Sequence, residues 1–200
     1  MTSVETARYL RWKRAFDVSF ALLALTVMAP VLAVIALAIR LTSPGPALFV
    51  QSRVGRKGKI FRMYKFRTMR RSPETESDRL WTAANDPRCT RFGAFLRRSS
   101  LDELPQFFNV LRGDMSVVGP RPERPFFCVK FTHEIRRYSD RLRLQAGITG
   151  WAQVHGYRGD TSMRRRVACD LYYLRHWSFP LDLRIIFRTL CQGFFNPNAY

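Results

Sequence analysis

The sequence predicts an α+β fold that is predominantly helical, has a few short strands, and enters a membrane from one side. Three observations favour this monotopic class. Residues 18–39 contain no charged side chain, a run as long as the roughly 20 residues that cross a bilayer. Later segments repeat apolar residues every three or four positions, as amphipathic helices do. Two short apolar runs flank a Gly55–Gly58 turn, which is typical of a hairpin.

The chain carries a large positive charge. Its 200 residues include 34 basic and 15 acidic side chains, giving a formal net charge of +19 at neutral pH. A surplus of this size indicates an anionic partner, which is nucleic acid, acidic lipid or a phosphorylated substrate. The four cysteines are widely spaced and form no zinc pattern with the three histidines, so we expect free thiols facing the cytosol.

The first predicted unit is residues 1–43, a basic segment followed by a membrane helix. Pro30, in the middle of the charge-free run, removes the hydrogen bond to the Thr26 carbonyl and bends the helix. Basic flanks prefer the cytoplasm, and both ends of the run have them. We therefore expect a re-entrant helix broken at Pro30, with a straight span or a buried soluble helix as alternatives. The flanking basic residues are Arg8, Arg11, Lys13 and Arg14 before the run, and Arg40, Arg53, Arg56, Lys57 and Lys59 after it.

The second predicted unit is residues 44–200, one domain on the cytoplasmic face with helices lying in the membrane interface. A turn at residues 42–46 ends the first helix, and strands are expected at residues 47–52 and 59–66. The basic stretch that follows, from Lys65 to Arg71, is interpreted as a solvated face or a contact with acidic lipid. Residues 72–86 are expected to form a surface loop or short helix, and residues 90–98 a helix.

The chain is organised around residues 99–121, SSLDELPQFFNVLRGDMSVVGPR, which contain the adjacent carboxylates Asp102 and Glu103. A helix is predicted to start either at Ser100, which stands in capping-box spacing to Glu103, or at Pro105. Gly113 is its expected end. Both registers place the two carboxylates at the positive end of a short helix, which favours each ionised form by roughly 0.3–1 kcal/mol.

Helix capping alone would explain a single acidic residue at this place. Here arginines surround the pair: Arg97 and Arg98 precede it, and Arg121 follows in a turn-rich run. Arginines hold phosphate oxygens through paired donors, and a carboxylate can act as a covalent nucleophile. The stretch therefore indicates a metal and phosphate site.

The C-terminal third is predicted to be mainly helical, with helices at residues 125–143, 162–176 and 180–195, a turn at 145–150, a short strand at 151–154 and a loop at 155–160. Asp170 lies within the apolar stripe of the second helix, either as an edge charge or as a site residue. The last helix carries Arg184 and Arg188 four residues apart. It is interpreted as an interfacial helix or as an ordinary core helix.

The order of several runs is specific. They are KRAFD (13–17), QSRVG (51–55), YKFRTM (64–69), DPR (86–88), SLDELPQFFNVLRGDMSVVGPRPE (100–123), GITGWAQVHGYRG (147–159) and DLYYLRHWS (170–178). From about Lys13 to Leu190 the chain resembles the bacterial sugar transferases, the monotopic polyprenyl-phosphate phosphoglycosyl transferases. Larger members carry membrane helices before this unit, so the resemblance implies the catalytic unit alone.

The resemblance implies a transferase that moves a sugar 1-phosphate from a nucleotide diphosphate sugar, usually a UDP-sugar, to polyprenyl (undecaprenyl) phosphate. Asp102 matches the nucleophile that carries the phosphosugar, and Glu103 matches its partner, a metal ligand or base. Magnesium is the implied cofactor, with Asp102, Glu103 and Asp170 as its expected ligands. Arg97, Arg121 and Arg158 are expected to contact phosphate.

The implied location is the cytoplasmic face of the bacterial inner membrane, at the first membrane step of polysaccharide or glycoconjugate assembly. Anionic lipid is an expected partner, and a homodimer is left open. The alternatives are a nucleic-acid-binding protein and a membrane-surface protein without catalysis. Charge favours the former, but the chain has no recognisable binding motif and its charge-free run does not suit that class, so no nucleic acid is expected.

Overall fold

The computed structural model describes residues 3–70 and 87–192. The expected loop or short helix at residues 72–86 lies outside the described residues. The described part is mostly helical with a few short strands, as predicted. Its α-helices are α1 (Ser3–Thr42), α3 (Arg91–Arg98), α4 (Gln106–Arg112), α5 (Pro125–Glu134), α6 (Trp151–Val154), α7 (Met163–His176) and α8 (Phe179–Gln192). Its strands are β1 (Leu48–Val54), β2 (Ile60–Phe66), β3 (Met115–Val118) and β4 (Ala146–Thr149). Its 3-10 helices are η1 (Arg56–Gly58), η2 (Leu101–Glu103) and η3 (Tyr138–Arg143).

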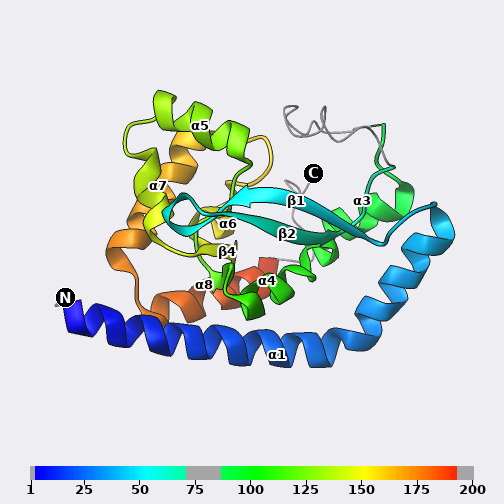
Figure 1. The fold of residues 1–200 in the computed structure, drawn as a ribbon, viewed down its shortest axis with the longest axis horizontal. Coiled ribbons are helices and arrows are strands. Elements are labelled where there is room, and N and C mark those ends of the chain that lie inside the picture. The colour runs from blue at the N-terminus through cyan, green and yellow to red at the C-terminus, as the bar shows by residue number, and fades with distance from the viewer. Residues whose placement is uncertain (1–2, 71–86, 193–200) are drawn as a thin grey trace.

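Helix α1 runs along the base of the molecule and then bends away from its first direction (Figure 1). It contains Pro30, whose ring removes one backbone hydrogen bond from the helix. Within the described residues it is the one helix long and apolar enough to cross a membrane, over Leu10–Thr42. The mean hydropathy of its most apolar window is 2.7, and 11% of that window is buried inside the protein.

The N-terminal part of α1 is fixed to the body by buried ionic contacts. The Lys13 ammonium lies 3.0 Å from Asp17 Oδ1 and 3.1 Å from Asp182 Oδ2 on α8. The same Asp17 oxygen accepts a hydrogen bond from the backbone N–H of Val117 on β3 at 3.1 Å. Arg14 donates to carbonyl oxygens in the last turn of α4. Lys13 and Arg14, two of the four basic residues before the charge-free run, therefore make internal contacts with the body.

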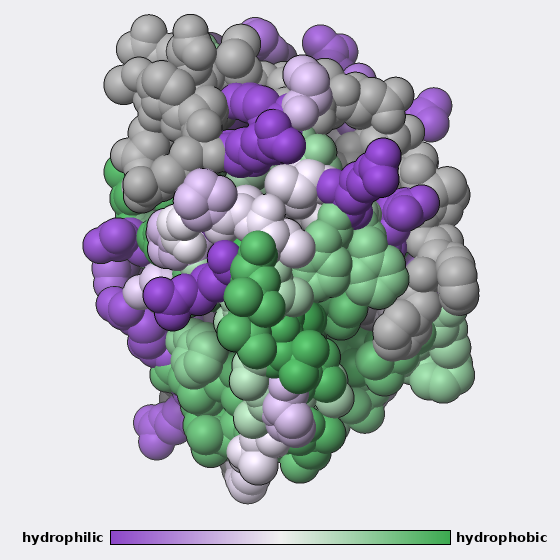
Figure 2. Space-filling view, turned by 90° about the vertical axis from the view of Figure 1, so that its right-hand side faces the viewer, coloured by the Kyte–Doolittle hydropathy of each residue, from purple (hydrophilic) through white to green (hydrophobic). Residues whose placement is uncertain are grey.

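The middle of α1 presents its apolar side chains outward. These exposed residues are Leu22, Leu23, Val27, Val31, Val34 and Leu37. Further along, Ile35 and Ile39 return to the body and pack with Phe66 and Leu96. Figure 2 shows a continuous hydrophobic surface across the centre and lower part of the side on which α1 bends, with hydrophilic residues above it. Both ends of α1 thus contact one body while its middle remains uncovered.

Strands β1 and β2 form the expected antiparallel hairpin, with Leu48 opposite Phe66 and Val54 opposite Ile60. The hairpin crosses the view above α1, with α5 and α7 toward one end and α3 toward the other (Figure 1). Phe61 and Met63 on β2 are buried and join the main core with Val110 on α4 and Met115 on β3. Because Lys65 follows on the same face of β2, the strand directs it toward the α4 side of the hairpin.

Three C-terminal predictions were wrong. The segment expected to turn at 145–150 contains β4, which pairs in parallel with the unpredicted β3. Its glycines permit close approach rather than a turn, since a Cβ at Gly147 would lie 2.1 Å from the backbone nitrogen of Gly119. The strand expected at 151–154 is helix α6. Four residues are too few to distinguish the two-residue repeat of a strand from the 3.6-residue repeat of a helix. The helix expected at 125–143 ends at Glu134, because Ile135 is extended with φ −123° and ψ 115°, and η3 follows after Arg137.

Candidate functional site

The two adjacent carboxylates lie in η2, the single turn that links α3 to α4. Ser100 precedes this turn in the left-handed region, with φ 55° and ψ 15°, and its side chain caps nothing. The capping-box register is therefore wrong. Helix α4 begins directly after Pro105, close to the second predicted register, and ends as expected at Gly113, whose φ is 85°. Asp102 and Glu103 consequently stand in the turn that leads into the positive end of α4.

Helix α3 holds this turn against the end of β2. Thr90 caps the helix, its Oγ1 accepting from the Gly93 N–H at 2.9 Å. Gly93 packs directly on the backbone that leaves β2, since a Cβ there would lie 2.0 Å from the Thr68 carbonyl oxygen. The predicted helix at 90–98 is thus confirmed, and its last turn brings Arg97 close enough for its charge to act on Asp102.

Both carboxylate oxygens of Glu103 accept hydrogen bonds from cationic side chains. Its Oε1 accepts from Lys65 Nζ at 2.7 Å and from Arg121 Nη2 at 2.5 Å. Its Oε2 accepts from Arg121 Nη1 at 3.1 Å, which completes a bidentate pair. Burial alone would raise the pKa of Glu103, but Arg121 and Lys65 overcome that effect and hold its pKa well below the ordinary value. Glu103 is therefore a fixed negative charge across the neutral range.

Asp102 differs from its neighbour. It is 6% exposed, and the nearest cation among the described residues is the Lys65 ammonium, 3.8 Å from Oδ2. None of the described residues donates a hydrogen bond to its carboxylate oxygens. Burial, together with the charge of Glu103, raises its pKa to about 6 although Lys65, Arg97 and Arg121 act against the rise. Adjacent carboxylates whose pKa values are driven apart in this way commonly have separate chemical roles.

The three arginines predicted to contact phosphate all interact electrostatically with the carboxylate pair. Arg121 grips Glu103, and Arg97 acts on Asp102. Burial lowers the pKa of Arg158, which also feels the charges of Glu103 and Arg121. The buried Nε of Arg158 has no hydrogen-bond partner among the described residues. A guanidinium desolvated beside other cations, with a donor still free, suits an anionic ligand.

Asp170 lies on α7, apart from the carboxylate pair in η2. It is 2% exposed on α7, and its Oδ2 accepts from Arg141 Nε and Nη2, both at 2.8 Å. Arg141 Nη2 also donates to the backbone carbonyl of Arg121 at 2.8 Å. Asp170 thus anchors Arg141, and Arg141 in turn holds the backbone of the arginine that grips Glu103.

The structure does not bring Asp102, Glu103 and Asp170 together as one ligand set. Within residues 3–70 and 87–192, no three His, Cys, Asp or Glu side chains are grouped closely enough to hold a metal ion. Mg²⁺, however, commonly takes one or two carboxylates and completes its shell with water and substrate phosphates. The free oxygens of Asp102 fit that smaller set, whereas those of Glu103 already accept from cations.

Sequence reasoning missed two residues of this site. Lys65 was assigned to a general basic stretch, although it ion-pairs with Glu103. Its signal is the alternation of β2, which places it on the same face as Phe61 and Met63. Arg141 was hidden in a segment predicted as one long helix, and no pattern in the sequence marks its contact with Asp170.

The family model described as "Bacterial sugar transferase" matches residues 8–196. The chain is 48% identical over 194 residues to the UDP-glucose:undecaprenyl-phosphate glucose-1-phosphate transferase of Escherichia coli K12, covering 94% of this chain and 41% of that protein. It is 43% identical over 180 residues to the UDP-N-acetylgalactosamine-undecaprenyl-phosphate N-acetylgalactosaminephosphotransferase of Aeromonas hydrophila, covering 89% and 42% of the two chains. It is 46% identical over 185 residues to the exopolysaccharide production protein PSS of Rhizobium leguminosarum bv. phaseoli, covering 89% and 92%. The chain therefore spans about two fifths of the length of the first two relatives and nearly all of the third.

Proposed function

Because this chain belongs to the bacterial sugar transferase family, we propose that it transfers a sugar 1-phosphate from a UDP-sugar to undecaprenyl phosphate. The names of the relatives from Escherichia coli and Aeromonas hydrophila support this donor and acceptor. Those two names carry different sugars, glucose and N-acetylgalactosamine, so the identity of the sugar is left to experiment.

One observation supports the mechanism above all others. Asp102 is buried and accepts no hydrogen bond from the described residues, while Glu103 beside it accepts from Arg121 and Lys65. A carboxylate without donors keeps its lone pairs for attack, and a pKa of about 6 leaves it mainly ionised at neutral pH. We assign the nucleophile to Asp102. Glu103 is assigned to holding Arg121 and Lys65, because a carboxylate with a strongly lowered pKa is a poor base.

In the first step, an Asp102 oxygen attacks the sugar-bearing phosphorus of the UDP-sugar. A phosphorus–oxygen bond forms to Asp102, the bond to the bridging oxygen breaks, and UMP leaves with that bonding pair. Arg121, Arg158 and Arg97 offset the negative charge of the diphosphate as Asp102 approaches it. The product is a phosphosugar held as an acyl phosphate on Asp102.

In the second step, a phosphate oxygen of undecaprenyl phosphate attacks the same phosphorus. The bond to Asp102 breaks, the carboxylate is restored, and undecaprenyl diphosphate sugar leaves. Lys65 lies within 3.8 Å of Asp102 and stabilises the carboxylate as it departs. The net reaction converts the UDP-sugar and undecaprenyl phosphate into UMP and undecaprenyl diphosphate sugar.

Mg²⁺ is proposed as the cofactor. One Asp102 oxygen would be its protein ligand, leaving the other for attack, and water and substrate phosphates would supply the remaining ligands. When bound it would neutralise the charge of the diphosphate and stabilise the leaving oxygen. Asp170 is not included, because it is already paired with Arg141.

We further propose that α1 enters the inner membrane from the cytoplasmic face and returns to that face. The support is that Lys13 and Asp17 bond to the body near one end, while Ile39 packs on it near the other. A straight span would separate those ends by a hydrocarbon core about 30 Å thick. The exposed apolar middle of α1 and the proline within it suit a bend inside that core.

The proposed reaction is tested with purified protein in nanodiscs that contain undecaprenyl phosphate and with a panel of UDP-sugars. We expect UMP release that requires Mg²⁺ and matches the undecaprenyl diphosphate sugar formed, for one or a few of the sugars. Matched reactions without undecaprenyl phosphate control for hydrolysis. Absence of UMP release from every donor, in protein that is folded and incorporated, would refute the proposed activity.

A further inference from the structure

A second basic pocket lies away from the carboxylate pair. It has a volume of about 270 Å³ and is bounded by the β1–β2 turn on one side and the turn after α4 on the other. Its lining residues are Gly55, Arg56, Lys57, Lys59, Phe61, Gly113, Asp114 and Gln145. Phe61 and Lys65 are four residues apart on β2, so this pocket is about 13 Å along the strand from the site of Glu103.

No described carboxylate forms an ion pair with the three cations of this pocket, Arg56, Lys57 and Lys59. The buried Nε of Arg56 also has no hydrogen-bond partner there. The one carboxylate of the lining, Asp114, lies 3.6 Å from Arg112 and is partly engaged by it. Three cations therefore face a cavity with one shared negative charge.

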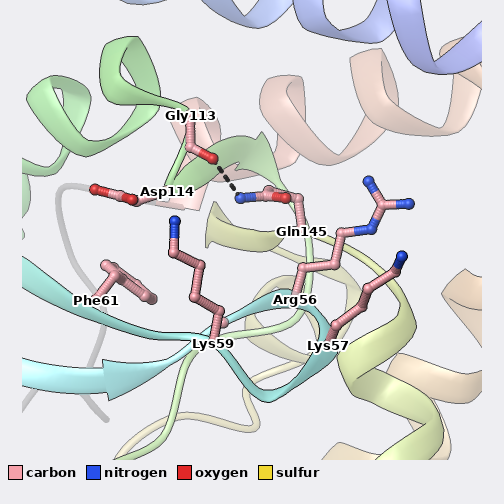
Figure 3. Close-up of a pocket in the computed structure, with 8 residues that line it drawn as sticks. Arg56, Lys57, Lys59, Phe61, Gly113, Asp114 and Gln145 are labelled. Atoms are coloured by element: carbon pink, nitrogen blue, oxygen red, sulfur yellow. Dashed lines mark hydrogen bonds between the residues drawn. The ribbon is translucent and has the colours of Figure 1, made fainter.

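The turn that carries these cations includes one residue, Lys57, in an unfavourable backbone conformation. Lys57 adopts φ 57° and ψ 24°, a left-handed conformation that glycine or asparagine takes more readily than lysine. The turn is closed by the Gly55 N–H, which donates to the Lys59 carbonyl at 2.8 Å. Figure 3 shows the Lys59 side chain extending toward Gly113 and Asp114, with Arg56 and Lys57 rising from the same turn. The Gln145 side chain fixes the opposite wall by donating to the Gly113 carbonyl at 2.7 Å.

The pocket adjoins the point at which α1 becomes apolar. Arg14, four residues before the charge-free run, donates to the carbonyls of Val110 and Leu111. The wall residues Gly113 and Asp114 follow one residue later in the chain. If α1 enters the membrane as proposed above, this wall lies near headgroup depth. The volume is below the roughly 300–1,000 Å³ of sites for drug-sized ligands, which suits a headgroup better than a nucleotide sugar.

We propose that this basic pocket binds the phosphate of an anionic ligand, with the headgroup of an acidic phospholipid as the ligand favoured by its position. Arg56, Lys57 and Lys59 supply the charge. A phosphate held beside the foot of α1 would fix the depth of the anchor, a role that requires no contact with Asp102. The lipid assignment rests on the proposed membrane insertion, whereas the phosphate chemistry rests on the pocket itself.

The test measures the thermal unfolding midpoint of the full chain in zwitterionic detergent during titration with dihexanoyl phosphatidylglycerol. Dihexanoyl phosphatidylcholine and inorganic phosphate are titrated in parallel. A ligand that binds the folded state raises the midpoint as its concentration passes the Kd. We expect a saturable rise with phosphatidylglycerol and none with phosphatidylcholine.

Lys57→Asn removes one cation with a residue that tolerates the left-handed turn, and Lys59→Gln removes another from an exposed, extended position. Each is expected to weaken phosphatidylglycerol binding about fivefold, the effect of one basic residue near a lipid surface. Lys130→Gln, which removes a charge from exposed α5, is the matched control and should change nothing.

Stabilisation by inorganic phosphate that depends equally on Lys57 and Lys59 would support the site and assign it to a soluble phosphate. Equal effects of both lipids, no effect of any phosphate, or an equal loss in the Lys130 variant would overturn the proposal. The measurement involves no turnover. Its failure therefore leaves the proposed transferase activity standing, and failure of that activity leaves this binding result interpretable.

Discussion

Asp102 and Glu103 are chain neighbours of the same charge, yet their surroundings drive their pKa values in opposite directions. Burial raises the pKa of Asp102 to about 6. Lys65, Arg97 and Arg121 oppose this rise, but none of them donates a hydrogen bond to the Asp102 carboxylate. Glu103 is equally desolvated, but direct bonds from Arg121 and Lys65 hold its pKa well below the ordinary value. The contrast supports the proposed roles, in which Asp102 is the nucleophile and Glu103 holds Arg121 and Lys65.

The first half-reaction should therefore depend on a single ionisation near pH 6. Asp102 must be ionised to attack, so the rate of UMP release without lipid acceptor should fall about tenfold for each pH unit below 6. Glu103 should add no second acid limb in this range, because its pKa lies lower. Using the first half-reaction removes the titration of undecaprenyl phosphate from the profile. A rate that stays level down to pH 5 would contradict the raised pKa of Asp102.

Asp170→Asn separates the observed anchoring contact from the metal-binding role that the family resemblance implied. Removing this charge leaves Arg141 buried without its partner, which should lower the free energy of unfolding by roughly 3–5 kcal/mol. Residual activity should retain the wild-type half-saturation for Mg²⁺, measured by metal titration of UMP release. A large rise in that half-saturation would instead make Asp170 a metal ligand.

Asp140→Asn is the matched control for this variant. Asp140 pairs with Arg137 at 2.7 Å, but both side chains are partly exposed. Solvent screening should limit its effect on the free energy of unfolding to less than about 1 kcal/mol.

At the scale of elements, the contact between α3 and the end of β2 positions the site turn. Gly93→Ala would place a methyl group 2.0 Å from the Thr68 carbonyl oxygen, so the backbone of one partner must move. Because α3 leads directly into η2, we expect that movement to displace the carboxylate pair. We expect about 1–3 kcal/mol of destabilisation and a loss of roughly tenfold or more in UMP release.

Thermal unfolding and initial rates measure the two effects of Gly93→Ala. Ala94→Ser, at the next and half-buried position of α3, is the control and should have little effect on either. Wild-type stability and activity in the Gly93 variant would show that this contact does not position the site.

The elements that could be predicted are those with local signals. The β1–β2 hairpin and the end of α4 at Gly113 follow from turn and cap residues, and a helix was also expected where α3 lies. The pairing of β3 with β4 could not be predicted, because glycines that permit close backbone approach resemble turn residues in sequence. In the site, the arginines around Asp102 were visible as a cluster, whereas the anchoring of Arg141 depends on contacts between distant segments.

At the scale of the whole molecule, one body holds both ends of a long apolar helix. The buried Lys13–Asp17–Asp182 contacts fix the first end, and Ile35 with Ile39 packs the second. The exposed apolar middle then has no counterpart to cover it within the described residues, which is the arrangement expected of an anchor that dips into a bilayer.

This topology predicts the same accessibility for positions before and after the apolar run. Arg11→Cys and Thr42→Cys, each in a chain whose four native cysteines are replaced, should resist a membrane-impermeant maleimide in spheroplasts. Both should react in inverted membrane vesicles, and detergent-solubilised protein controls for reactivity. Labelling of one position in spheroplasts and the other in inverted vesicles would indicate a straight span.

The proposed covalent step is tested most directly by incubating the protein with Mg²⁺ and a UDP-sugar labelled in the sugar phosphate, without undecaprenyl phosphate. We predict that the chain acquires the label on Asp102, identified by peptide mass spectrometry, and releases it when undecaprenyl phosphate is added. Asp102→Asn, which removes a buried charge and should remain folded, is predicted to acquire none. An unlabelled wild-type chain that still forms undecaprenyl diphosphate sugar would contradict the mechanism, because the transfer would then be direct.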